Sequence, residues 1–320
     1  MSTARRGSFA ETFEAIAANV ERVVQGKPEV IELALLCLVA EGHLLIEDVP
    51  GVGKTSLAKA LAASIDVRWT RIQFTPDLLP SDVVGVTIFN RSRSEFEFRP
   101  GAVFANLVLG DEINRASPKT QSALLEAMEE RQVTVDGHTH VLDAPFMVIA
   151  TQNPIEHEGT YPLPDSQLDR FLMRVTIGYP ARRAELDILD THAGDAVVDD
   201  LQPVATAKDV IAMTLAARDI HVAPSLKGYL VDLAEASRSH PALAIGMSPR
   251  ATLSLQRASR ARAAANGRAY VVPDDIKELA GPVLSHRLVL TPEAAMQSAN
   301  PATVVDDILR RVPVPTSRDT

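Results

Sequence analysis

The chain has 320 residues, of which 46% are hydrophobic and 23% charged, a composition typical of a globular protein with one large domain and a smaller one. A formal net charge of −9 at pH 7 argues against a dedicated nucleic-acid binder, because contacts to phosphates need a basic surface. The single cysteine, Cys37, excludes an intrachain disulfide. No stretch reaches 18 uncharged apolar residues and no signal-peptide core follows the first residues, so we expect a cytoplasmic protein without a membrane span.

Two helices are predicted before the first strand. Ser8-Phe9-Ala10-Glu11 has the pattern of a capping box, and apolar residues continue at helical spacing to about Val24. The stretch 25–28, Gln-Gly-Lys-Pro, ends this helix. A second and very apolar helix is expected from there through Ala40.

A phosphate-binding loop is predicted at residues 49–55, between an apolar strand at 44–46 and a helical pattern. Gly51 and Gly53 permit backbone conformations that aim successive N–H groups at one anion, and the helix N-terminus adds partial positive charge. Lys54 would reach the β- and γ-phosphates of ATP, and the Thr55 hydroxyl would ligate Mg²⁺. Asp48 stands where the strict pattern has its first glycine, which leaves open the alternative of a glycine-rich turn before Lys-Thr.

A strand is expected at residues 69–74, and an exposed hairpin is expected near 90–98, where polar and aromatic residues alternate. Phe96 and Phe98 would lie on the same face of their strand. They could grip a partner or cover the edge of their own domain.

Two carboxylates, Asp111 and Glu112, follow the apolar run at 107–109. Asp111 would hold Mg²⁺, directly or through water, and Glu112 would polarise the water that attacks the γ-phosphate. Two acids after a strand can also be no more than the solvated start of a loop. The phosphate-binding loop earlier in the chain favours the catalytic interpretation.

Further along, a helix is predicted at 118–130 and a hairpin at 132–142, where Asp-Gly separates two alternating runs. His138 and His140 share a face of that hairpin. We expect solvated histidines there, because no third zinc ligand is indicated nearby.

The fold predicted from these elements is α/β, with ATP bound at the carboxyl ends of a parallel sheet covered on both faces. Residues 1–180 would form this domain and residues 181–320 an all-helical lid, with the boundary near Tyr179-Pro180. After residue 291 we expect one short helix and a frayed tail. The five strands are expected at 44–46, 69–74, 107–109, 146–150 and 173–177, and the lid helices at 184–192, 207–218, 226–238, 249–266 and 273–284.

Several of these stretches, taken together and in order, resemble the MoxR family of AAA+ ATPases. Residues 110–119 resemble the family signature DEINRA-x-P-K, and Asp48 fits because such proteins often carry Glu-Asp-Val-Pro-Gly at this place. The resemblance covers about residues 9 to 290. The other matching stretches are 46–55, 150–154, 168–171 and 248–251.

The resemblance implies roles for residues that the local pattern does not assign. Asn153 resembles the sensor that hydrogen-bonds the attacking water or the γ-phosphate. Arg170 resembles an arginine finger that reaches the γ-phosphate on the neighbouring subunit, and Arg250 resembles a lid arginine that touches the same nucleotide. The implied nucleotide contacts are Val24, Gln25 and Gly26 beside the adenine, and Pro50, Gly51, Val52, Gly53, Lys54, Thr55 and Ser56 around the phosphates.

The function implied by the resemblance is that of an Mg²⁺-dependent ATPase in a homo-oligomeric ring, a hexamer, which remodels or matures partner proteins. A client or adaptor with a von Willebrand factor A domain is the partner type that the family implies. The alternatives are a nucleic-acid-linked AAA+ motor, a magnesium-chelatase-like ATPase subunit, and a scaffold that binds nucleotide without hydrolysing it. The acidic balance disfavours the first, and the DEINRA-x-P-K form disfavours the second.

Overall fold

The computed structural model describes residues 8–154, 159–183, 185–186, 198 and 200–315. Residue contacts divide the chain into two compact units. The sheet unit comprises Ala15–Leu163 and Val175–Ile211, and the helical unit comprises Met1–Glu14, Pro164–Arg174 and Ala212–Thr320. The expected domain boundary near residue 180 stays a prediction.

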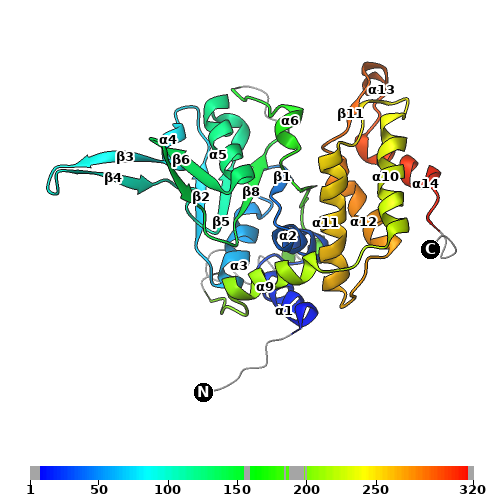
Figure 1. Cartoon of the computed structure of the whole chain (residues 1–320), viewed down its shortest axis with the longest axis horizontal. Coiled ribbons are helices and arrows are strands. Elements are labelled where there is room, and N and C mark those ends of the chain that lie inside the picture. Colours follow the sequence, from blue (N-terminus) through cyan, green and yellow to red (C-terminus); the bar gives the residue numbers. More distant parts are fainter. Residues whose placement is uncertain (1–7, 155–158, 184, 187–197, 199, 316–320) are drawn as a thin grey trace. The chain divides into compact units, whose positions relative to one another are not determined.

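The central sheet has five strands in the order β2-β5-β8-β1-β9 (Figure 1). Every residue of β5 is buried, as are the first five of β8, so both faces of the central strands are covered. The β2–β5, β5–β8 and β8–β1 pairs are parallel, which confirms the predicted fold class. The five strands are those predicted from the sequence: β1 (Leu44–Glu47), β2 (Trp69–Gln73), β5 (Leu107–Asp111), β8 (Met147–Gln152) and β9 (Met173–Val175).

Helices connect these strands and begin at the residues that the sequence marks. The predicted capping box is present, because the Ser8 N–H donates to Glu11 Oε2 (2.7 Å) and the Glu11 N–H donates to Ser8 Oγ (3.3 Å). Helix α3 packs against β5 and β2. The helices up to residue 168 are α1 (Phe9–Glu21), α2 (Pro28–Val39), α3 (Lys54–Ile65), α4 (Pro80–Val84), the 3₁₀ helix η1 (Ile113–Arg115), α5 (Pro118–Glu130) and α6 (Asp165–Leu168).

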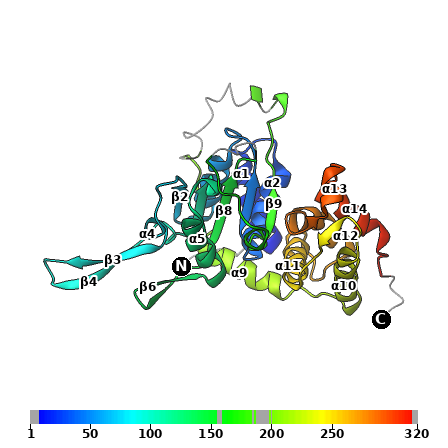
Figure 2. The same ribbon diagram turned by 90° about the horizontal axis from the view of Figure 1, so that it is seen from above.

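Two antiparallel hairpins belong to the sheet unit. The first, β3 (Gly85–Asn90) with β4 (Glu95–Pro100), begins earlier than expected, and both views show it projecting away from the sheet (Figures 1 and 2). The second, β6 (Gln132–Val135) with β7 (His138–Val141), confirms the predicted Asp-Gly turn. His138 is exposed as expected, whereas His140 is half-buried because its ring stacks on Phe98 with a centroid distance of 3.8 Å.

The same stack distinguishes Phe98 from Phe96, the other phenylalanine of β4. Phe98 covers its own domain, since it also meets the Phe104 ring edge-on at 5.5 Å. Phe96 remains 76% exposed and contacts Phe89, which is 52% exposed, at a centroid distance of 5.3 Å. Of the two roles weighed for this pair, Phe98 has the covering role, and a partner contact of Phe96 stays a prediction.

The helical unit contains the helices predicted at 226–238, 249–266 and 273–284, together with some elements that the sequence did not reveal, and the helix predicted at 207–218 is divided between the two units. A short antiparallel pair, β10 (Leu243–Ile245) with β11 (Val289–Leu290), lies among the helices. The C-terminal region holds two helices where one was expected, because Pro292 and Pro301 each open a separate helix with a side-chain N-cap. The helices from residue 207 are α9 (Ala207–Arg218), α10 (Pro224–Arg238), α11 (Pro249–Ala265), α12 (Pro273–Leu284), α13 (Pro292–Met296) and α14 (Pro301–Arg311).

Part of the predicted organisation falls on residues that are not described. Most of the helix expected at 184–192 lies outside the described residues, which include only 185 and 186 of it. Within the described ranges, no helix is both long enough and apolar enough to cross a membrane.

Candidate nucleotide-binding site

The loop between β1 and α3 has the geometry that anion binding requires. Gly51 and Gly53 have φ values of +86° and +93°, which L-residues with side chains rarely adopt. A Cβ built on either glycine would meet no heavy atom within 4 Å, so the loop borders open space. The first N–H groups of a helix have no partner within the helix. Helix α3 begins at Lys54 without a side-chain cap, so no N-cap side chain accepts from these groups either. These observations fit a bound phosphate chain.

Asp48, which replaces the first glycine of the strict loop pattern, has a structural role. Its carboxylate is buried and accepts three backbone N–H groups: those of Ile177 (2.8 Å) and Gly178 (2.6 Å) on Oδ2, and that of Val49 (2.8 Å) on Oδ1. A glycine could not accept these bonds. The Lys54 ammonium donates to the Asp48 carbonyl oxygen over 2.9 Å. Asp48 thus ties the loop to the chain segment after β9.

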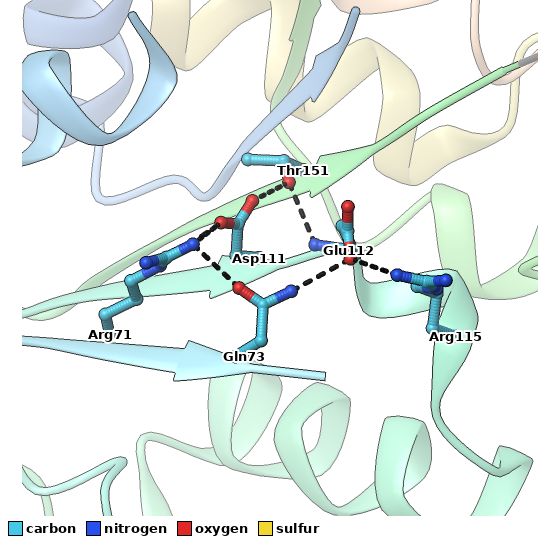
Figure 3. A network of polar contacts seen from close by, with 6 residues as sticks. All are labelled: Arg71, Gln73, Asp111, Glu112, Arg115 and Thr151. Atoms are coloured by element: carbon cyan, nitrogen blue, oxygen red, sulfur yellow. Dashed lines mark hydrogen bonds and ion pairs between the residues drawn. The ribbon is translucent and has the colours of Figure 1, made fainter. Parts of the chain in front are cut away.

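The strand register gathers polar side chains at the carboxyl edge of the sheet. Gln73 at the end of β2 is aligned with Asp111 at the end of β5. Asp111 Oδ1 accepts the Thr151 hydroxyl (2.6 Å) from β8, and its Oδ2 accepts Arg71 Nη2 (2.5 Å) and Nε (3.2 Å), as Figure 3 shows. The carboxylate thereby has partners from both neighbouring strands. Its charge is compensated by a guanidinium group.

Glu112 is held just beyond the strand in a left-handed conformation, with φ +56°. A non-glycine residue adopts this conformation only where its surroundings hold it. Its N–H donates to Thr151 Oγ1 (2.9 Å), and its Oε2 accepts Gln73 Nε2 (2.9 Å) and Arg115 Nη1 (2.9 Å) (Figure 3). The Glu112 carboxylate therefore has a defined position beside that of Asp111.

Four members of this network, Arg71, Gln73, Arg115 and Thr151, were not assigned a role from the sequence. Arg71 Nη2 donates to both Asp111 Oδ2 and Gln73 Oε1 (2.7 Å), and Gln73 Nε2 donates to Glu112 Oε2. Asp111, the candidate Mg²⁺ ligand, is therefore connected to Glu112 through the Arg71 guanidinium and the Gln73 amide. The signal that could have found Arg71 and Gln73 is the alternation of side chains along β2. Arg71 and Gln73 are two residues apart and therefore lie on one face at the strand end.

The donor set of this edge fits a magnesium ion. Mg²⁺ prefers oxygen ligands, and it is commonly held by one or two protein oxygens together with water and phosphate. Asp111 offers a carboxylate, and Thr55 offers a hydroxyl in the first turn of α3. These are the residues predicted to hold the ion.

The remaining predicted residues are distributed over both units. Asn153 follows β8 and is buried, at the edge where the Asp48 N–H donates to the Gln152 carbonyl (3.2 Å). Val24, Gln25 and Gly26 form the turn between α1 and α2, and Gly26 has φ +68°. Arg170, after α6, and Arg250, in the first turn of α11, belong to the helical unit. The roles of these residues stay predictions.

Comparisons with known proteins place the chain in a family. Residues 43–173 match the family model described as ATPase family associated with various cellular activities (AAA), and residues 235–308 match the AAA lid domain. The chain is 40% identical to Chaperone MoxR1 of Mycobacterium tuberculosis over 313 residues, which are 95% of this chain and 82% of the relative. The chain belongs to the MoxR family of AAA+ ATPases. The resemblance stated from the motifs is thereby confirmed.

Two further similarities extend over nearly the whole chain. The uncharacterized protein YeaC of Bacillus subtilis is 50% identical over 300 residues, 94% of each chain. A crystal structure of a Cytophaga hutchinsonii protein assigned as an ATPase superposes with a TM-score of 0.90 at 38% identity and covers 96% of both chains. The fold found here is therefore shared with the Cytophaga hutchinsonii protein over nearly the whole of both chains.

Proposed function

We propose that this MoxR-family protein hydrolyses ATP with Mg²⁺ at the carboxyl edge of its sheet and uses the reaction to remodel partner proteins. The observation that carries the proposal is the pairing of two features at that edge. One is a glycine loop whose N–H groups border open space, and the other is an adjacent pair of carboxylates held in place by Thr151, Gln73 and Arg115.

Different residues of this site bind the phosphates, hold Mg²⁺ and activate the attacking water. The loop N–H groups and Lys54 bind and orient the phosphates, and Thr55 and Asp111 hold Mg²⁺, which supplies charge stabilisation when it is bound. Glu112 accepts the proton of the attacking water, and its contacts to Gln73 and Arg115 fix the carboxylate before the substrate arrives.

Catalysis completed across a subunit interface is part of the proposal. Asn153 orients the water, Arg250 contacts the nucleotide from the lid, and Arg170 acts on the γ-phosphate of the next subunit in a homo-oligomeric ring, a hexamer. AAA+ family membership supports a ring assembly. The relative named Chaperone MoxR1 supports work on partner proteins. The exposed Phe89–Phe96 pair at the hairpin supports a contact with such a partner, a client or an adaptor with a von Willebrand factor A domain.

The test of the nucleotide site is the Lys54→Ala variant. We expect ATP binding to be largely lost, because the β- and γ-phosphates lose the ammonium of the loop. Lys59→Ala is the matched control, since Lys59 lies on the same helix and its ammonium sits 5.7 Å from the Trp69 ring centroid. Equilibrium titration with a fluorescent ATP analogue measures both. Equal affinity in the two variants would show that the phosphates bind elsewhere.

A second measurement separates this function from that of a nucleic-acid motor. We expect no stimulation of ATP hydrolysis by single- or double-stranded DNA at physiological salt, because a protein of net charge −9 offers few counterion-releasing contacts. Stimulation of several-fold that weakens steeply with salt would instead support the motor.

A further inference from the structure

The segment that carries Arg170 is held by a buried arginine of the helical unit. Arg287, three residues after α12, has a side chain that is only 3% exposed. Its Nη2 donates to the carbonyl oxygens of Asp169 (3.2 Å) and Phe171 (2.7 Å), and its Nε lies 3.3 Å from Asp169 Oδ1. These contacts of one guanidinium thus fall on the two residues that flank Arg170.

His286 adds a contact to the same segment. Its Nε2 donates to the Phe171 carbonyl oxygen over 3.0 Å, and the imidazole is buried. Burial, together with the neighbouring charges of Arg287 and Arg174, lowers the pKa of His286 to about 3, so the ring is neutral at physiological pH and Nε2 carries the proton. The Phe171 carbonyl oxygen therefore accepts hydrogen bonds from both residues.

The backbone around Arg170 is also held by a local hydrogen bond and by buried neighbours. The Arg170 N–H donates to the Gln167 carbonyl oxygen (3.2 Å), and Phe171, Leu172 and Met173 are buried. Burying a guanidinium is unfavourable unless it is paired, and the partners of this one lie in a segment more than 110 residues earlier in the chain. The contact pattern also places Pro164–Arg174 in the helical unit and not in the sheet unit.

We propose that Arg287, assisted by His286, is the positioning residue for Arg170, so that the lid sets the geometry of the finger offered to the neighbouring subunit. This inference rests on the proposed function, in which Arg170 acts in trans. Arg287 itself touches neither nucleotide nor water in this account. It acts by orienting the Cα–Cβ bond of Arg170 through the two flanking carbonyls.

The consequence for catalysis is specific. An arginine finger contributes about 10³–10⁵ in rate, and a misplacement of about 1 Å can lower a rate about 10²-fold. Arg287→Met should therefore slow hydrolysis about 10–100-fold while leaving ATP affinity unchanged. The double variant with Arg170→Ala should be no slower than Arg170→Ala alone, because the clamp has nothing left to position.

A mixing experiment distinguishes positioning of the finger from general damage to the lid. Glu112→Gln subunits have an intact finger but cannot hydrolyse ATP at their own site. An Arg287→Met subunit has an intact Glu112 and a displaced finger, so mixing it with Glu112→Gln should restore activity that neither has alone. Mixing Arg287→Met with Arg170→Ala should restore none, because both then lack a working finger.

The controls separate failure of this inference from failure of the proposed function. Arg268→Met removes a comparable lid arginine, which pairs with Asp275 (2.6 and 2.7 Å) and does not contact residues 164–174, and we expect its hydrolysis rate to stay within about twofold of the wild type. If Arg170→Ala with Glu112→Gln stays inactive despite demonstrated subunit exchange, the trans finger is wrong. If that pair recovers but Arg287→Met with Glu112→Gln does not, only the positioning role is wrong.

A second variant covers the case in which the methionine substitution does not fold. Arg287→Lys keeps the charge but replaces the planar guanidinium by a single ammonium group, which cannot reproduce the same set of contacts. Like Arg170→Ala, it should recover activity on mixing with Glu112→Gln. It should recover none on mixing with Arg170→Ala, and Arg268→Lys is its matched control. Wild-type activity in Arg287→Lys and no gain on mixing would overturn the proposal.

Discussion

Two arginine–aspartate pairs of this protein differ in their surroundings and in what they do. Arg71 pairs with Asp111 at the sheet edge, where 47% of the arginine side chain is exposed. Arg287 pairs with Asp169 in the helical unit, where 3% is exposed. The exposed pair sits where substrate is expected and can exchange its partners with water or a metal ion. The buried pair cannot exchange, so it determines the position of the chain that it holds.

The largest expected effect on folding stability follows from the buried pair. Arg287→Met removes the guanidinium from the Asp169 carboxylate and from the Asp169 carbonyl, and it leaves the Phe171 carbonyl with His286 alone. Loss of one member of a buried pair typically lowers stability by about 3–5 kcal/mol. We expect the free energy of unfolding to fall by this amount in urea denaturation followed by circular dichroism. A loss below about 1 kcal/mol would mean that the pair behaves like a surface pair.

A smaller effect is expected from pH, through the neighbouring histidine. The pKa of His286 is about 3 in the folded protein, first because burial disfavours the cation and then because Arg287 and Arg174 repel it. The unfolded chain takes up this proton below about pH 6.5, so the contribution to stability is present above that pH and is lost as the pH falls toward 3. Between pH 7 and pH 5 the loss from this residue alone is about 2 kcal/mol.

The measurement compares the wild type with His286→Gln, whose amide can still donate to the Phe171 carbonyl. The difference between their unfolding free energies should shrink as the pH is lowered from 7 to 5, and contributions from other groups cancel in the comparison. Parallel pH profiles would show that His286 takes up its proton as readily in the folded protein as in the unfolded chain.

The smallest effect is expected at the exposed pair. Arg71→Met should change the free energy of unfolding by no more than about 1 kcal/mol, because the Arg71 side chain is half exposed and the Asp111 carboxylate keeps the Thr151 hydroxyl as a partner. The same urea experiment measures it beside Arg287→Met. A loss as large as that of Arg287→Met would remove the distinction between the two pairs.

The sequence predicted the parts of the site whose signals are local. The phosphate-binding loop and the acidic pair each follow directly from a few consecutive residues, and the five strands follow from short apolar runs between turn residues. Asp48 could not be interpreted in this way. Its partners Ile177 and Gly178 lie about 130 residues later, and only the sheet order brings them beside the loop.

The polar network and the buried clamp also depend on contacts between distant segments. Gln73 meets Glu112 because β2 and β5 pair in one particular register, which no local pattern specifies. Arg287 lies just after the C-terminus of a helix. From the sequence, a cation at such a position is predicted to be solvent-exposed and to interact favourably with the helix dipole. Its burial against Asp169 and Phe171 becomes visible only in the folded chain.

The central claim is that Glu112 activates water for ATP hydrolysis at a site that binds ATP without it. The most direct measurement compares the wild type with Glu112→Gln in parallel assays of ATP binding and of phosphate release with Mg²⁺. We expect the affinity to be retained and the hydrolysis rate to fall about 10²–10⁴-fold, because an amide cannot accept the proton of the attacking water. Phosphate release at the wild-type rate in Glu112→Gln would contradict the account.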